Sequence, residues 1–152
     1  MRPWASAGMR MSRHLPRAVL LDTHVWLWLI NADPTLSVRV RRAVTHAAVE
    51  SRVLVSAISV WEVGMLEAKG RIRLGKDCEA WVREALALPG VRLVPVDERV
   101  ALSSTRLPGD FHGDPADRLL VATARAVDAT LATRDAAILA YGREGYVRTI
   151  EA

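Results

Sequence analysis

Four carboxylates occupy positions in the sequence from which their side chains could meet in one site. Asp22 ends the first apolar run, and Asp135 follows a run that ends at Thr133. Glu62 lies in the first turn expected after the second apolar run, and Asp117 lies in the first turn of a later expected helix. Carboxylates gathered in one cleft repel each other unless they stay protonated or bind a cation. Because Mg²⁺ and Mn²⁺ prefer hard oxygen ligands and accept phosphate oxygens beside them, the pattern predicts metal-assisted hydrolysis of phosphodiester bonds.

Each of these acids also fits a helix cap. The segment Ser59-Val-Trp-Glu62 has the pattern of a capping box, and Asp114, which a proline follows, is typical of an N-cap. Asp22 and Asp135 could likewise cap the helices that follow them. The two roles are compatible, because a helix N-terminus keeps a carboxylate ionised, as metal binding requires.

Short apolar runs that alternate with helical patterns predict the scaffold for these acids. The expected strands lie at residues 17–22, 52–56, 91–96, 129–133 and 146–150. The expected helices span residues 37–50, 59–69, 77–88, 97–104 and 115–127. This alternation is typical of a three-layer α/β/α domain with a mostly parallel sheet, in which ligands bind at the carboxyl ends of the strands.

Residues beside the four acids are candidates for auxiliary roles. Asp114 could ligate the metal as well as cap its helix. The hydroxyls of Thr23 and Thr133 could contact a phosphate or a water, and a local cap is the alternative for each. Arg118 could meet a substrate phosphate or pair with a neighbouring carboxylate, and the same two alternatives hold for Arg134.

The order of four motifs resembles that of the PIN-domain ribonucleases of the VapC toxin type. The first motif is Leu21-Asp22-Thr23-His24-Val25-Trp26, and the longest is LPGDFHGDPADRLL at residues 107–120. The segments Ser59–Glu62 and Leu131–Asp135 match in order and approximate spacing, so the similarity extends over residues 18–150. Ala116 departs from this branch, which often has an aromatic residue there, and the departure concerns local packing more than chemistry.

The resemblance implies a parallel sheet that carries a Mg²⁺-dependent endoribonuclease site, with Mn²⁺ as a substitute. The acidic quartet of the family falls on Asp22, Glu62, Asp117 and Asp135, as catalytic residues and metal ligands. The resemblance also implies an RNA substrate, a homodimer and a cognate antitoxin whose tail occupies the groove beside the acids. We therefore expect the toxin of a toxin–antitoxin pair, acting in the cytoplasm. The alternative is a PIN-like RNA-processing nuclease or a non-catalytic module that binds RNA or a partner.

Two other classes of protein fit part of this pattern. His24 and His112 flank the acids and could act as general acid and base in a metal-free ribonuclease that uses the RNA 2′-hydroxyl, although they could equally order loops or carboxylates. The metal-free route leaves cyclic phosphate ends and survives chelation, whereas the metal route leaves 5′-phosphate ends and does not. A phosphate-signalling receiver domain shares the acid cluster but needs a lysine beyond a late strand, and the sequence contains only Lys69 and Lys76.

The segment Val25–Ile30 is apolar on every side of a helix, so it is either wholly buried or partly covered by another chain. Because both Trp26 and Trp28 are hard to bury in a small domain, we expect a dimer whose interface includes Trp28. Trp61 and Trp81 lie within helical apolar patterns, which favours core positions over base-stacking ones.

Charge and composition set the domain boundaries. The 152 residues contain 21 Lys and Arg and 17 Asp and Glu, a formal net charge of +4. Residues 1–17 contain four arginines and no acid, which predicts a basic leader of transit-peptide or start-site origin before a formally neutral domain at residues 18–152.

The single cysteine excludes an internal disulfide framework and a cysteine-rich zinc site. The longest apolar stretch, residues 18–32, is interrupted by polar residues and is too short to span a membrane.

The four acids also decide the charge of the predicted domain. Without them, residues 18–152 carry 17 basic and 13 acidic side chains. A cation that neutralises the quartet would therefore leave a basic domain, so we expect chelation of the metal to weaken RNA binding.

Overall fold

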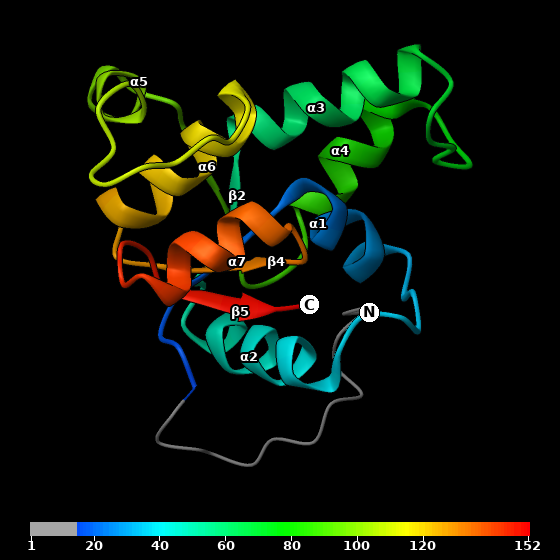
Figure 1. Ribbon diagram of the computed structural model, residues 1–152. Coiled ribbons are helices and arrows are strands. Elements are labelled where there is room, and N and C mark those ends of the chain that lie inside the picture. The colour runs from blue at the N-terminus through cyan, green and yellow to red at the C-terminus, as the bar shows by residue number, and fades with distance from the viewer. Residues whose placement is uncertain (1–14) are drawn as a thin grey trace.

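The computed structural model describes residues 15–152, so most of the predicted leader, residues 1–14, lies outside the described residues. One or two helices connect each strand to the next along the chain (Figure 1). Their order is β1 (Val19–Leu21), α1 (Thr23–Ile30), α2 (Val38–Val49), β2 (Val53–Ser56), α3 (Ala57–Ala68), α4 (Cys78–Leu86), β3 (Val91–Val94), α5 (Glu98–Ser104), α6 (Pro115–Ala126), β4 (Thr130–Thr133), α7 (Ala136–Arg143) and β5 (Thr149–Glu151). None of the helices in this part of the chain is long and apolar enough to cross a membrane.

The five strands form one parallel sheet in the order β3-β2-β1-β4-β5. From the central strand β1 the chain extends the sheet to one side through β2 and β3, and it then adds β4 and β5 on the other side. The boundary between β1 and β4 is therefore the topological switch point, the place at which ligands bind in such sheets. The predicted parallel sheet is confirmed.

Alternate strand residues supply two hydrophobic clusters on opposite faces of the sheet. Val19 and Leu21 pack in a cluster with residues of α1, α2 and α4. Leu20 and Leu131 pack in the other cluster with residues of α6 and α7. Figure 1 shows α2 and α7 on opposite sides of β5. The three-layer α/β/α architecture expected from the sequence is therefore present.

Each helix in residues 15–152 begins after a Ser or Asp whose side chain accepts a backbone N–H, as capping residues do. These residues are Asp22, Ser37, Ser56, Asp77, Asp97, Asp114 and Asp135. Helix α3 differs from the expectation, since Ser56 is its cap and it begins at Ala57, two residues before Ser59. The interpretation of Ser59 and Glu62 as a capping box is therefore wrong, because both residues lie inside the helix.

The last two elements also differ in detail from the sequence patterns. The final strand begins at Thr149 rather than Tyr146, because Gly145 turns the chain with a φ of 91° and the Tyr146 ring stacks on Tyr141. The helix expected only from its cap at Asp135 spans Ala136–Arg143.

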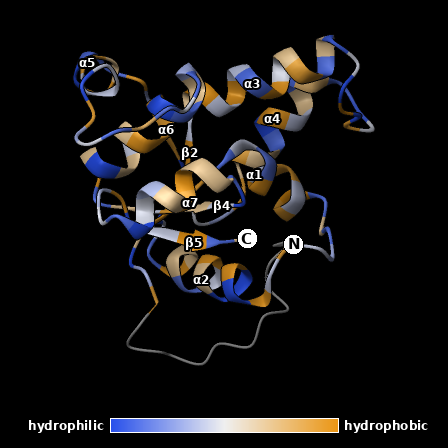
Figure 2. Cartoon of the chain, in the orientation of Figure 1, coloured by the Kyte–Doolittle hydropathy of each residue, from blue (hydrophilic) through white to orange (hydrophobic). Residues whose placement is uncertain are grey.

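The tryptophans of the described chain lie in different environments. Trp81 is buried in the core, as expected, and its ring packs edge to face with that of Trp26, which is fully buried. Figure 2 shows hydrophobic positions along α1 among more polar ones. Trp28 is half-buried under the guanidinium group of Arg134, which lies 4.3 Å from its ring centre. Trp61 is 57% exposed, so its expected core position is wrong. The buried side of α3 runs through Ser59 and Val63 instead.

Leu131 lies fully buried in β4, so its truncation should test the assigned core. We expect Leu131→Ala to lower the free energy of unfolding by about 2–5 kcal/mol, because it removes apolar contacts and leaves a cavity. Leu102, which is 54% exposed on α5, provides the control, and Leu102→Ala should change this free energy by less than about 0.5 kcal/mol. Urea denaturation measures both values, and equal losses would contradict the burial described here.

Candidate functional site

The structure brings all five candidate carboxylates to the carboxyl edge of the sheet. Asp22 and Asp135 follow the adjacent strands β1 and β4, and the Asp22 N–H donates to the Ala132 carbonyl oxygen at 3.0 Å. Asp114 caps α6 and Asp117 is the third residue of that helix. Glu62 reaches the same place from α3. The Asp117 carboxylate interacts electrostatically with each of the other four, so the sequence correctly placed these acids in one region.

Two hydrogen bonds fix the Asp22 carboxylate at the switch point. Its Oδ1 accepts the backbone N–H of Thr23, and its Oδ2 accepts the hydroxyl of Thr133, each at 2.7 Å. The Thr133 side chain is fully buried, and its oxygen also accepts the N–H of Asp135 at 3.0 Å. A single threonine hydroxyl therefore connects the residues that follow β1 and β4.

A second hydroxyl contact orients Glu62. The Thr23 hydroxyl donates to Glu62 Oε1 at 2.7 Å, and its oxygen lies 2.9 Å from the hydroxyl oxygen of the buried Ser59. Sequence reasoning missed this role of Ser59 because it assigned Ser59 to a cap. The available signal was spacing, since Ser59 lies three residues before Glu62 and residues at that spacing share one face of a helix.

Burial makes ionisation of Asp22, Glu62 and Asp117 unfavourable. It raises the pKa of Asp22, against the lowering effect of the hydrogen bond from Thr133, and it raises the pKa of Glu62, against that of the hydrogen bond from Thr23. The pKa of Asp117 rises to about 7, first through burial and then through repulsion from Asp114, Asp135, Asp22 and Glu62. Among residues 15–152, no group donates a hydrogen bond to the Asp117 carboxylate, so a proton or a cation is its remaining source of compensation.

The donor chemistry of this cluster fits a hard divalent cation such as Mg²⁺, because all of its candidate ligands are carboxylate oxygens. The positions of these side chains fit less closely, since no group of three or more His, Cys, Asp or Glu within residues 15–152 is arranged to hold a metal ion. Asp22 uses both oxygens in hydrogen bonds, and Asp114 and Asp135 each use one oxygen to cap a helix. Carboxylates suitable as metal ligands therefore lie in one place, but several of their oxygens accept hydrogen bonds from the protein itself.

The arginines next to the acids do not pair with carboxylates in the described chain. Arg118 donates to the backbone oxygens of Ser104 and Phe111, at 2.8 and 2.6 Å, and so fastens the loop that precedes α6. Arg134 donates to the backbone oxygens of Ala152 and Thr35, each at 2.8 Å. Both side chains support loops around the acids rather than pairing with them.

The two candidate histidines differ in their relation to the site. His24 lies on the exposed side of α1, and its charge lowers the pKa values of Asp22 and Glu62. His112 is exposed and lies 3.0 Å from Asp110, outside the carboxylate cluster. Only His24 is therefore in electrostatic contact with the acids.

The sequence matches a family model and a characterised relative. The model of the PIN domain matches residues 19–144. Ribonuclease VapC22 of Mycobacterium tuberculosis (strain ATCC 25618 / H37Rv) is 37% identical over 117 residues, which cover 77% of this chain and 86% of the relative. Residues 19–144, which the family model matches, include all five carboxylates of the site.

Solved structures with this fold include two proteins from other bacteria. DNA-bound VapBC from Salmonella typhimurium matches with a TM-score of 0.62 and 15% identity, covering 88% of this chain and 97% of that chain. FitAcB from Neisseria gonorrhoeae matches with a TM-score of 0.58 and 26% identity, covering 87% of this chain and 96% of that chain. The first likeness concerns the fold alone, and both extend across most of the sheet and its helices.

The raised pKa of Asp117 predicts how the stability of the metal-free protein depends on pH. The folded chain holds this proton more tightly than the unfolded chain, in which the pKa has its ordinary value of 3.8. The resulting stabilisation is complete below about pH 4 and is lost as the pH rises through about 7. In EDTA, we expect the melting temperature of the unsubstituted protein to fall as the pH rises from about 4 to about 7. The fall should be smaller in Asp117→Asn, which should melt at a higher temperature than the unsubstituted protein at about pH 8.

Circular dichroism melting curves measure this effect. Glu67→Gln removes an exposed acid from the far end of α3 and should leave the pH dependence unchanged. An Asp117→Asn protein whose stability falls as steeply with pH as that of the unsubstituted protein would contradict the assigned pKa.

Proposed function

Since the chain belongs to the PIN-domain family, we propose that it is an endoribonuclease that hydrolyses RNA phosphodiester bonds at its carboxylate edge with a bound divalent cation, Mg²⁺ or Mn²⁺. It acts as the toxin of a toxin–antitoxin pair, in the cytoplasm. The 37% identity to Ribonuclease VapC22 over most of both chains supports RNA as the substrate. The likeness to VapBC complexes supports a cognate antitoxin as the partner.

The observation that carries the proposal is the environment of Asp117. This carboxylate is half-buried, receives no hydrogen bond from residues 15–152, and is repelled by four other carboxylates, so that its pKa rises to about 7. Ionisation of Asp117 therefore costs folding free energy, because charge is unfavourable in this environment. This arrangement suits a site that is completed by a cation.

The quartet of Asp22, Glu62, Asp117 and Asp135 would hold the cation, with Asp114 beside it. A bound cation would supply charge neutralisation at the phosphate and would lower the pKa of a water molecule, the nucleophile of such a hydrolysis. The chain's own contribution is to keep its ligands in place. Thr133 holds Asp22 and the Asp135 backbone, and Thr23 holds Glu62, which limits the orientations open to these side chains.

Asp22→Asn tests the proposal directly. We expect this substitution to reduce cleavage of RNA by at least about a hundredfold, because it removes a charged ligand. The Asn oxygen still accepts the Thr23 N–H, and the Asn amide nitrogen can donate to the Thr133 hydroxyl oxygen, so the fold should persist. Cleavage of a labelled RNA by the purified protein, with and without EDTA, gives the rates. Asp110→Asn makes the same chemical change at an exposed acid outside the quartet, and it should cleave like the unsubstituted protein.

The chemistry of the product ends separates the metal route from a metal-free one. 5′-Phosphate ends and complete loss of activity in EDTA agree with the proposal. Cyclic phosphate ends, activity that survives EDTA, and a large loss in His24→Gln would instead support general acid–base catalysis and would overturn the metal mechanism. Full activity of Asp22→Asn would refute the assignment of the quartet.

We also propose that the chain forms a homodimer through a surface that includes Trp28. This side chain remains half-buried in the single chain even with Arg134 over its ring. Light scattering at micromolar concentration should give the mass of a dimer, and Trp28→Glu should give a monomer with an unchanged circular dichroism spectrum. A monomeric unsubstituted protein would contradict this interface.

A further inference from the structure

Arginines lie next to the first residues of three strands, at the edge of the sheet opposite to the carboxylates. Arg17 lies two residues before β1, and Arg52 and Arg148 directly precede β2 and β5. Because all five strands are parallel, the residues before them gather at the same edge. In the strand order this gives a row of Arg52, Arg17 and Arg148, with Asp128, two residues before β4, between the last two. We refer to this row, together with Arg125, as the amino-edge arginines.

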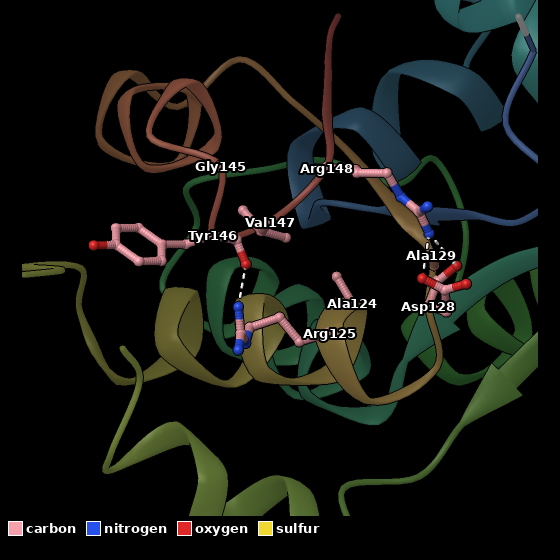
Figure 3. A pocket seen from close by; sticks show the side chains of 8 residues that line it. All are labelled: Ala124, Arg125, Asp128, Ala129, Gly145, Tyr146, Val147 and Arg148. Carbon is pink, nitrogen blue, oxygen red and sulfur yellow. Dashed lines mark hydrogen bonds and ion pairs between the residues drawn. The ribbon is translucent and has the colours of Figure 1, made fainter. Parts of the chain in front are cut away.

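Two adjoining clefts open along this row. The first has a volume of about 300 Å³ and is lined by Arg17, Arg52, Asp128 and Arg148. The second has a volume of about 310 Å³ and is lined by Arg125 together with the same Asp128 and Arg148. Figure 3 shows Arg148 extending to Asp128, while Arg125 reaches the backbone oxygen of Tyr146. Since Asp128 and Arg148 line both clefts, the clefts adjoin at this ion pair, and together they bring the four arginines to one side of the protein.

The positive charge of this surface is only partly compensated. Four arginines line the clefts together with one acid, Asp128, and Glu50 lies 3.5 Å from Arg52. These ion pairs are exposed, with 62% of the Arg148 side chain and 89% of the Asp128 side chain in contact with solvent, so they add little to stability. Each guanidinium has five N–H donors in a planar fork, and only a few of them are used here. The remaining donors can bind phosphate groups bidentately.

We propose that the amino-edge arginines bind the phosphate backbone of RNA, without a metal ion and without regard to base sequence. The proposal rests on the proposed function, in which RNA is the substrate. The carboxylates at the opposite edge repel phosphates until a cation is bound, so a second surface has to supply the initial electrostatic attraction. Strands lie about 4.8 Å apart, so the row from β2 to β5 spans roughly 14 Å and can accept more than one phosphate group.

This placement implies a long or folded substrate. One RNA molecule has to reach from the clefts around the sheet to the carboxylates at its other edge. Contacts of arginine with phosphates position the RNA and do not select bases. The carboxylate edge and the amino edge therefore contribute differently, the first to cleavage and the second to affinity.

The test measures RNA binding by the 152-residue protein in EDTA. Fluorescence anisotropy monitors binding of two labelled 30-nucleotide RNAs of unrelated sequence. The double variant Arg17→Gln/Arg52→Gln should bind both RNAs about tenfold more weakly at low salt. The slope of log Kd against log salt concentration should fall by about 1.4, since each phosphate contact to a single strand contributes about 0.7. Neither side chain donates a hydrogen bond to residues 15–152, so the fold should persist, which melting curves check.

Two further variants make the test specific. Arg73→Gln/Arg83→Gln removes the same charge from exposed positions after α3 and on α4, and it should bind RNA like the unsubstituted protein. Asp128→Asn removes the acid between the arginines and should strengthen RNA binding severalfold. Asn tolerates the φ of 56° at this position, so the turn is preserved.

Equal affinity of the two double variants, or weaker binding by Asp128→Asn, would overturn the proposal. The proposal would also be overturned if Arg17→Gln/Arg52→Gln weakened binding of an acidic protein partner and left RNA binding unchanged. RNA cleavage by Asp22→Asn tests the proposed function, whereas RNA binding by the arginine variants in EDTA tests the proposal for the amino-edge arginines. Each can therefore fail without the other.

Discussion

The burial and crowding of carboxylates at one edge of the sheet is the constraint on which the rest of this structure depends. Burial, and after it repulsion from the four neighbouring acids, raises the pKa of Asp117 to about 7, so ionisation of this carboxylate is unfavourable. The surrounding structure offsets part of this cost with two buried hydroxyls, Thr133 on Asp22 and Thr23 on Glu62. Asp117 receives no comparable hydrogen bond from the described residues. The protein thus holds the side chains of its acids in place but leaves much of their negative charge uncompensated. A site that binds a cation requires both.

Helix caps and site residues are the same groups in this fold. Asp22, Asp114 and Asp135 each accept a backbone N–H at the start of a helix, and each does so at the carboxyl edge of the sheet. The parallel sheet brings these helix N-termini together, and their partial positive charges favour ionised carboxylates. Local helix formation and assembly of the site therefore reinforce each other. This agreement explains why singly weak motifs, in order, indicated the family correctly.

Features that local contacts determine could be predicted from the sequence, and features that tertiary contacts determine could not. The parallel sheet, the three layers and the gathering of Asp22, Glu62, Asp114, Asp117 and Asp135 follow from apolar runs and capping residues, which are local signals. The start of α3 was misplaced because Ser56 and Ser59 fit a cap equally well in sequence, and only the buried contact of Ser59 with Thr23 distinguishes them. Trp61 was misplaced for a related reason, since an apolar pattern does not tell which side of a helix faces the sheet. The partners of Arg118 and Arg134 are backbone oxygens of distant loops, which composition and spacing do not reveal.

The hydrogen bond between Thr133 and Asp22 joins residues that are 111 positions apart, and it crosses the central pair of strands. Asp22 is synthesised early, but its hydroxyl partner and the neighbouring Asp135 belong to the last part of the chain. A nascent chain that still lacks β4 therefore has no assembled carboxylate edge, even if β1, β2 and β3 have already paired. The strand order therefore delays completion of the edge until β4 has been made and has paired with β1.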